Sequence, residues 1–154
     1  MKRFSQLIQE CIERVNEIFP WDLEDMLKED DKPLLIDVRE PTEFEAMHIY
    51  NSINVPRGIL ETSCEYDFDD TIPELVEARD RDVVVICRSG NRSIFAADIM
   101  QQMGYKKVVS LKTGLRGWND SELPLVTKSQ EIIDIDNAEQ FFTPKLRPEQ
   151  LSPK

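Results

Sequence analysis

The chain has 154 residues and a formal net charge of −11, from 30 acidic and 19 basic side chains. This length is sufficient for one domain with a hydrophobic core that needs no disulfides or metal. The negative charge argues against binding to nucleic acids or to anionic membranes, because their phosphate groups would be repelled. No stretch approaches the ~18 consecutive apolar residues of a membrane span.

The three cysteines, Cys11, Cys64 and Cys87, form no close pair and no zinc-type spacing. An odd number of cysteines without an apolar signal segment is unlike a disulfide framework. The sequence therefore predicts a cytoplasmic protein in a reducing compartment.

Apolar residues recur at helical spacing from Phe4 to Phe19 and predict an amphipathic helix, which Pro20 ends or interrupts. We interpret its apolar stripe as packing on the domain itself, with a dimer or partner contact as the alternative. Cys11 lies on this stripe and is interpreted as a core residue. Asp22 is placed to cap a short helix that continues to about Lys28.

Four short segments have the pattern of buried parallel strands: residues 33–39, 52–56, 82–87 and 107–111. Residues 93–103 read as a helix, and Gly104 suits its C′ position. Strands that alternate with helices predict an α/β fold with a central parallel sheet of about five strands, flanked by helices on both faces.

The composition changes after Pro124, because prolines 124, 144, 148 and 153 all fall in the last part of the chain. This segment is predicted to lie against the domain at first and to fray toward Lys154.

Cys87 is the strongest candidate for chemistry, because it stands between the clearest strand and a predicted helix, where ligands bind in open α/β sheets. The loop after it contains small and cationic residues: Arg88, Ser89, Gly90, Asn91, Arg92 and Ser93. The small residues let backbone N–H groups point inward, and the arginines and the following helix add positive potential. These features favour a reactive thiolate and the anions that it carries or attacks.

The spacing from Cys87 to Arg92 separates two chemistries. Four residues lie between them. Cysteine phosphatases need one residue more, because a phosphate group with its oxygens requires a wider cradle. The smaller ring of amides favours a single sulfur atom, carried on Cys87 as a persulfide.

Blocks of the sequence resemble the single-domain rhodanese (thiosulfate sulfurtransferase-like) family over about residues 15–126. The blocks are 35–40 with Glu43-Phe44, His48-Ile49 with 52–56, 83–93, and Leu111 with Gly114 and Trp118. Met47, Asn51 and Thr113 stand where the family usually has glycine, which predicts altered local loops and an altered turn at Met47. An N-terminal amphipathic extension (1–14) and a C-terminal tail (127–154) lie outside the resemblance.

The resemblance implies a rhodanese-like domain that transfers sulfane sulfur by double displacement through a Cys87 persulfide, without a cofactor or metal. The donor would be a small sulfur-containing anion such as thiosulfate, and the acceptor would be cyanide, a thiol or a carrier protein. Residues 88–93 would bind the substrate and the persulfide. Two alternatives stay open: a sulfur-carrier or sensing module that acts on a docked partner, and a cysteine phosphatase or arsenate reductase.

Four further residues are candidates for supporting roles. Asp37 and Arg39 are interpreted first as a structural ion pair and second as substrate contacts. Arg57 and Glu61 are placed to line the mouth of the site and to influence the choice of donor.

The remaining candidates are His48 and Cys64. His48 is interpreted as making a structural hydrogen bond, because a thiolate stabilised by its loop needs no base. Cys64 lies among carboxylates that would raise its pKa. We interpret Cys64 as inert, with a resolving role for a Cys87 persulfide as the alternative.

Overall fold

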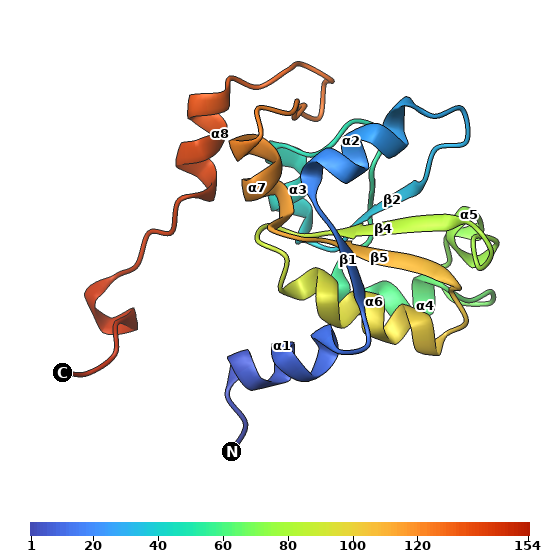
Figure 1. Cartoon of the computed structure of the whole chain (residues 1–154), viewed down its shortest axis with the longest axis horizontal. Coiled ribbons are helices and arrows are strands. Elements are labelled where there is room, and N and C mark those ends of the chain that lie inside the picture. Colours follow the sequence, from blue (N-terminus) through green and yellow to red (C-terminus); the bar gives the residue numbers. More distant parts are fainter.

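The computed structural model describes all residues, 1–154, and its centre is one parallel sheet (Figure 1). The strands lie in the order β1-β5-β4-β2-β3. They are β1 (Asn16–Ile18), β2 (Leu34–Asp37), β3 (Ile53–Asn54), β4 (Asp82–Ile86) and β5 (Lys107–Leu111). The predicted α/β fold with a five-stranded parallel sheet is confirmed.

Helices cover both faces of this sheet (Figure 1). They are α1 (Phe4–Ile12), α2 (Pro20–Lys28), α3 (Pro41–Ala46), α4 (Leu60–Ser63), α5 (Pro73–Val76), α6 (Arg92–Gln102), α7 (Gly114–Asp120) and α8 (Ile135–Phe142), with 3₁₀ turns η1 (Arg57–Ile59) and η2 (Pro148–Gln150). Buried residues of α1, α4, α5 and α6 share one hydrophobic cluster, and those of α2, α7 and α8 share the other. None of these helices has both the length and the apolar composition to cross a bilayer.

The central strand β4 explains where the side chain of Cys87 points. Successive side chains of a strand face opposite sides of the sheet. Val83 and Val85 belong to the cluster under α6, and Val84 and Ile86 to the cluster under α7. Cys87 continues the alternation and joins the α6 side.

The amphipathic helix expected from Phe4 to Phe19 is wrong in its second half. The helix α1 ends at Ile12, and Asn16–Ile18 form the edge strand β1, which pairs with Val109–Leu111 of β5. The pairing gives the backbone of β5 a partner, which outweighs the local helical spacing. The apolar stripe of α1 packs on the domain's own core through Ile8 and Ile12.

Pro20 begins a helix instead of ending one, because proline suits the first helical position. Asp22 is the third residue of α2, and its carboxylate accepts a hydrogen bond from the backbone N–H of Phe19 (2.9 Å). The predicted strand 52–56 shrinks to two residues. Five helices that the sequence pattern did not predict (α3, α4, α5, α7 and α8) are also present.

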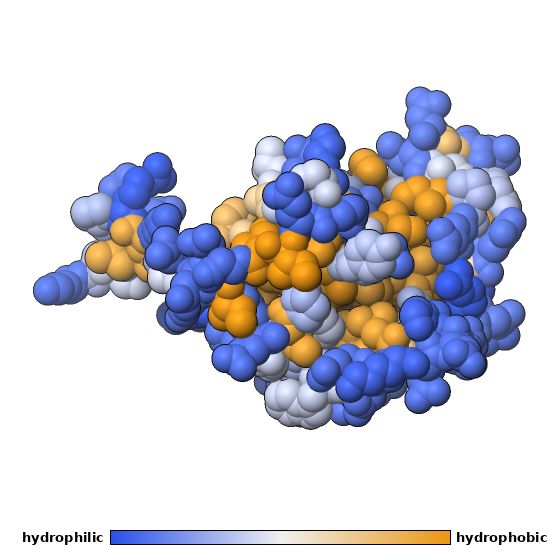
Figure 2. Space-filling model, turned by 90° about the horizontal axis from the view of Figure 1, so that it is seen from above, coloured by the Kyte–Doolittle hydropathy of each residue, from blue (hydrophilic) through white to orange (hydrophobic).

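The C-terminal segment contains the helix α8, which lies beside α7 with Phe142 fully buried. All residues from Thr143 to Lys154 are exposed. Figure 2 looks onto the face that carries α2, α7 and α8 and shows apolar residues gathered in its middle, with the end of the chain projecting from the side. The tail therefore has a packed first part and an exposed second part.

Candidate functional site

The sulfur of Cys87 lies in a ring of hydrogen-bond donors at the start of α6. Its Sγ accepts hydrogen bonds from the backbone N–H of Gly90 (3.1 Å) and of Ser93 (3.3 Å). The hydroxyl of Ser93 is also 3.3 Å from Sγ. The residue is only 1% exposed. This arrangement favours negative charge on the sulfur, because oriented amides and a helix N-terminus supply positive potential.

The hydroxyl of Ser93 links Cys87 to the neighbouring strand. Its Oγ lies 2.7 Å from the Oγ of Ser110 on β5, and both serines are fully buried. Sequence reasoning missed Ser110. The available signal is that Ser110 is the one polar residue in the apolar stretch Val108–Leu111. The pair holds the Ser93 hydroxyl at the sulfur.

The loop is held from its other side by the N-terminus of α7. The backbone N–H groups of Leu115 and Arg116 donate to the carbonyls of Cys87 and Arg88, both at 2.9 Å. Gly114 makes this approach possible, since its φ is +58° and a Cβ there would lie 2.5 Å from the Cys87 carbonyl oxygen. Gly90 also has a positive φ, +93°. Two glycines therefore set the shape of the site.

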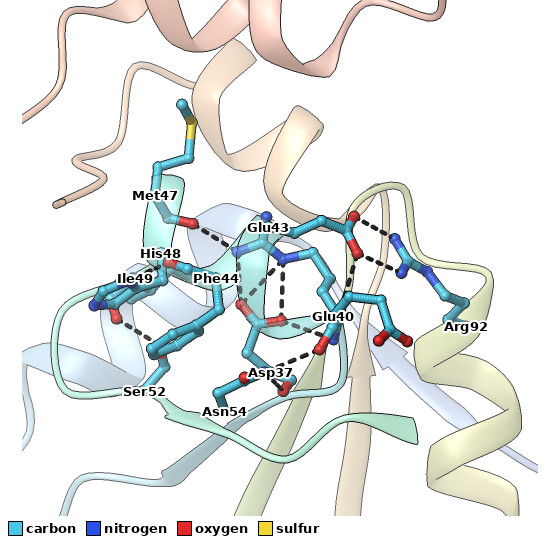
Figure 3. A network of polar contacts seen from close by, with 11 residues as sticks. Asp37, Glu40, Glu43, Phe44, Met47, His48, Ile49, Ser52, Asn54 and Arg92 are labelled. Atoms are coloured by element: carbon cyan, nitrogen blue, oxygen red, sulfur yellow. Dashed lines mark hydrogen bonds and ion pairs between the residues drawn. The ribbon is translucent and has the colours of Figure 1, made fainter. Parts of the chain in front are cut away.

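Arg92 forms a two-pronged ion pair with Glu43 of α3 (Figure 3). Both nitrogen–oxygen distances are 2.9 Å, and Glu43 also accepts from the backbone N–H of Glu40. Burial opposes ionisation of Glu43, but the hydrogen bonds from Arg92 and Glu40 outweigh it and hold the Glu43 pKa below its usual value. The hydrogen bond to Glu43 raises the pKa of Arg92, and the nearby Cys87 adds to this effect. Sequence reasoning missed Glu43 as a partner.

Arg88 extends in a different direction, toward the C-terminus of α8. Its Nη2 donates to the carbonyl oxygen of Phe142 at 2.5 Å. Hydrogen bonds from either arginine to the sulfur of Cys87 are absent. The groups that donate to Sγ are the backbone amides of Gly90 and Ser93, Sγ itself donates to the Ser93 hydroxyl, and the two arginines flank the loop.

Asp37 and Arg39 form a fully buried ion pair at the end of β2. The Nη2 of Arg39 lies 2.9 Å from Oδ2 of Asp37 and also donates to the carbonyl of Met47 (2.6 Å). The side-chain amide of Asn54 bridges the carbonyls of Asp37 and Arg39. The pair joins β2, β3 and the end of α3, which matches the first of the two interpretations.

The other predicted supporting residues make no hydrogen bond or ion pair with the cysteine loop. Arg57 and Glu61 pair with each other at 2.6 Å. The Nδ1 of His48 lies 2.7 Å from the carbonyl of Phe44, and the two rings stack at 3.9 Å. His48 thus holds a structural hydrogen bond. A cluster of His, Cys, Asp or Glu that could hold a metal ion is absent.

The three cysteines are unpaired and buried. Burial raises the pKa of the Cys64 thiol, and the nearby carboxylates of Glu61 and Glu65 contribute in the same direction. Burial and the carboxylate of Asp98 raise the pKa of Cys11. Both environments disfavour a thiolate.

The three residues at usual glycine positions behave differently. Met47 has an extended backbone (φ −166°), which any residue adopts. Asn51 is left-handed (φ 63°), as asparagine tolerates. Thr113 is also left-handed (φ 66°), a strained conformation for a β-branched residue. Of the three, Thr113 is therefore the costly substitution, and it immediately precedes Gly114.

A cavity of about 410 Å³ lies beside the loop. It is lined by Phe19, Pro20, Trp21, Ser89, Thr113, Arg116, Gly117, Asp120 and Ser121. A larger cavity of about 510 Å³ includes Leu34, at the start of β2, and contains no residue of the loop. The smaller cavity therefore lies at the end of the sheet where ligands of parallel sheets bind, and Ser89 is the loop residue that lines it.

Comparisons with known proteins place this site in a family. Residues 20–121 match the model of the rhodanese-like domain. A sulfurtransferase of Allochromatium vinosum is 34% identical over 112 residues, which are 73% of this chain and 95% of that protein.

Two solved structures are similar to the chain over most of its length. A rhodanese-related protein from Thermoplasma volcanium is 30% identical, with a TM-score of 0.60 over 73% of this chain and 99% of that one. A protein of unknown function from Rhodopseudomonas palustris CGA009, described as a "possible tyrosine phosphatase", is 27% identical, with a TM-score of 0.73 over 80% of this chain and 94% of that one. The chain belongs to the rhodanese-like sulfurtransferase family.

Proposed function

We propose that this protein is a thiosulfate sulfurtransferase in which Cys87 carries the transferred sulfur as a persulfide. The observation that carries the proposal is the pair of backbone N–H groups, from Gly90 and Ser93, within 3.1 and 3.3 Å of the Cys87 sulfur. A terminal persulfide sulfur is an anion, and such a ring of donors stabilises it without reorganising.

In the first step, the Cys87 thiolate attacks the outer sulfur of thiosulfate. A bond forms between the two sulfur atoms, the sulfur–sulfur bond of thiosulfate breaks, and sulfite leaves with the bonding electron pair. The enzyme then holds Cys87–S–S⁻, and the charge of the reactants is conserved. The loop residues Arg88 to Ser93 surround this anion with amide and hydroxyl donors.

In the second step, an acceptor nucleophile takes the outer sulfur. Cyanide, a thiol or a carrier protein attacks it, the persulfide bond breaks, and the electron pair returns to Cys87 as a thiolate. With cyanide the product is thiocyanate. With cyanide or a thiolate as the acceptor neither step moves a proton, so the site needs no general base, in keeping with the structural position of His48.

The short loop favours sulfur over phosphate. Four residues separate Cys87 from Arg92, and the guanidinium of Arg92 is already bound by both oxygens of Glu43. A phosphatase requires its arginine to clamp the phosphate oxygens. The structural likeness to the Rhodopseudomonas palustris protein makes phosphatase activity the second candidate, which an aryl phosphate assay tests directly.

We place the reaction in the cytoplasm, because three unpaired cysteines suit a reducing compartment. A sulfur-acceptor protein is the proposed partner in the cell. The alternative of a carrier that serves only a docked partner is tested by comparing sulfur transfer to cyanide with transfer to protein thiols.

The decisive experiment is intact-mass analysis after incubation with thiosulfate. We expect the native chain to gain one sulfur atom, the Cys87→Ser variant to gain none, and the Cys64→Ser variant to gain it like the native chain. Cyanide should then remove the sulfur and release thiocyanate. The proposal fails if the native chain gains no sulfur or if the Cys87→Ser variant gains it equally.

A further inference from the structure

The helix α8 lies outside the residues that match the rhodanese-like domain, yet it touches the cysteine loop. The match ends at residue 121, and α8 spans Ile135–Phe142. The side-chain amide of Asn119 on α7 donates to the carbonyl of Ile135 (3.0 Å), and Phe142 and Ala138 are buried in the core on this face. Figure 1 shows α8 at the end of the sheet from which the loop after β4 emerges.

The contact joins Arg88 to the last turn of α8. Phe142 is the final residue of the helix, and its carbonyl is one of the terminal groups that lack a partner within the helix. The Nη2 of Arg88 donates a hydrogen bond to this carbonyl oxygen at 2.5 Å. The C-terminus of a helix is also the negative end of its dipole, so a cation is favoured there.

The two arginines of the loop consequently differ in whether a neighbouring carboxylate compensates their positive charge. Arg92 is neutralised by the carboxylate of Glu43, to which it makes two hydrogen bonds. Arg88 makes its one side-chain hydrogen bond to a neutral carbonyl and takes part in no salt bridge. A guanidinium has five N–H donors, and the other four of Arg88 make no hydrogen bond to the protein. Arg88, which follows Cys87 in the sequence, is therefore a cation whose charge no carboxylate compensates.

Arg88 is fixed at both ends. Its carbonyl accepts a hydrogen bond from the backbone N–H of Arg116, and its guanidinium is held by Phe142. An unanchored arginine would lose side-chain entropy on binding an anion. An arginine that is already anchored loses less, so its affinity for an anion is higher.

We propose that α8 is a positioning element for the anionic sulfur donor: its C-terminal carbonyl holds Arg88 in place, and Arg88 attracts the donor to Cys87. This inference rests on the proposed function for the identity of the donor. It assigns a role to a part of the chain that the family resemblance does not reach.

The kinetic test uses three single variants, the double variant that combines Arg88→Gln with Phe142→Ala, and one shortened chain. Phe142→Ala withdraws the side chain that seats the end of α8, and Phe142→Leu refills the same apolar site as a rescue. Arg88→Gln removes the cation. A chain that ends at Thr143 keeps the Phe142 carbonyl as an amide and removes only exposed residues, so it is the matched control.

In steady-state assays with thiosulfate and cyanide, we expect Phe142→Ala to raise the KM for thiosulfate about tenfold, the size expected for loss of a charge-assisted contact, with kcat within about twofold. Arg88→Gln should raise the KM similarly. In the double variant, Phe142→Ala should add nothing, because its effect passes through Arg88. Phe142→Leu and the chain that ends at Thr143 should behave like the native protein.

The double variant separates positioning from general loss of packing, because a packing defect would persist without Arg88. The inference is overturned if Phe142→Ala leaves the KM unchanged, if it lowers kcat instead, or if the two changes are additive. Calorimetric binding of thiosulfate to Cys87→Ser, with and without Phe142→Ala, gives a readout that needs no turnover. If the native chain gains no sulfur, the proposed function is wrong. If the dissociation constant for thiosulfate is unaffected by Phe142→Ala, only this inference is wrong.

Discussion

Cys87 and Cys64 occupy two regions of the same hydrophobic cluster and are equally hidden from solvent, with 1% and 0% exposed. Their polar surroundings differ. Two backbone N–H groups and a hydroxyl meet the sulfur of Cys87. The sulfur of Cys64 accepts no backbone N–H, and burial raises its pKa although Tyr105 and Arg79 act in the opposite direction. Burial by itself therefore does not distinguish the two cysteines; the backbone donors around the sulfur do.

The two regions also differ in how the backbone is held. Cys87 follows the buried strand β4, and its loop is held by hydrogen bonds to the N-terminus of α7 and leads directly into α6. Cys64 follows the single turn of α4, and its carbonyl accepts from the guanidinium of Arg79 (2.6 Å). The first arrangement presents positive dipoles to the sulfur, and the second uses its cation to satisfy the backbone.

The largest effect on activity should come from disturbing the close contact between the N-terminus of α7 and the Cys87 loop. In Gly114→Ala, the new Cβ would lie 2.5 Å from the carbonyl oxygen of Cys87 and the backbone would be strained at φ +58°. We expect sulfur transfer to fall about 100-fold, since displacement of a reacting group by about 1 Å has effects of this size. Steady-state kinetics measure it.

The control is Gly58→Ala, because a Cβ at Gly58 meets nothing within 4 Å. Transfer by Gly58→Ala should match that of the native chain. Full activity in Gly114→Ala would show that the loop does not depend on this close approach.

A smaller effect should follow from removing one donor at the sulfur. Ser93→Ala deletes the hydroxyl 3.3 Å from Sγ but keeps the backbone N–H of residue 93. We expect the rate of persulfide formation to fall about tenfold, which corresponds to the loss of one hydrogen bond to a charged group. Rapid-quench mass analysis measures this rate.

Ser110→Ala makes the corresponding indirect change, because Ser110 touches Ser93 but not the sulfur. Its effect should be about threefold or less. If Ser110→Ala lowered the rate of persulfide formation as much as Ser93→Ala or more, Ser110 would not act only through Ser93.

The smallest effect concerns stability and pH. Glu43 has a pKa below its usual value, so the folded state binds fewer protons than the unfolded state in acid. The pair with Arg92 therefore stabilises the fold above the usual pKa of Glu43, 4.5, and this contribution is lost as the pH falls through the lower folded value. Because both side chains are partly exposed, we expect about 0.5–1 kcal/mol.

Urea unfolding of Glu43→Gln and of the native chain measures this difference. The gap between the two should be present at pH 7 and should narrow as the pH falls below 4.5. Glu74→Gln breaks an exposed pair with Arg81 and should change stability little at either pH. If the difference in free energy of unfolding between the native chain and Glu43→Gln widened in acid, the predicted direction of the pH dependence would be wrong.

The sequence by itself determined the parallel α/β class and the place of Cys87 between β4 and α6. Both depend on local signals: a run of β-branched residues, a stretch of small residues and a helical segment followed by Gly104. The count of residues from Cys87 to Arg92 also lies within one loop, so it could be read directly. The sequence could not show that residues 16–18 form an edge strand, because their local spacing also suits a helix.

Only the tertiary structure decided the partners of the loop. Arg92 meets Glu43 across 49 positions of sequence, and Arg88 meets Phe142 across 54. Ser110 reaches Ser93 from a neighbouring strand, and Gly114 approaches Cys87 from the next crossover. Such contacts depend on how parallel strands bring their carboxyl ends to one edge of the sheet, and periodicity along the chain does not encode them. The cysteine loop could be read locally, whereas the side chains that position it could not.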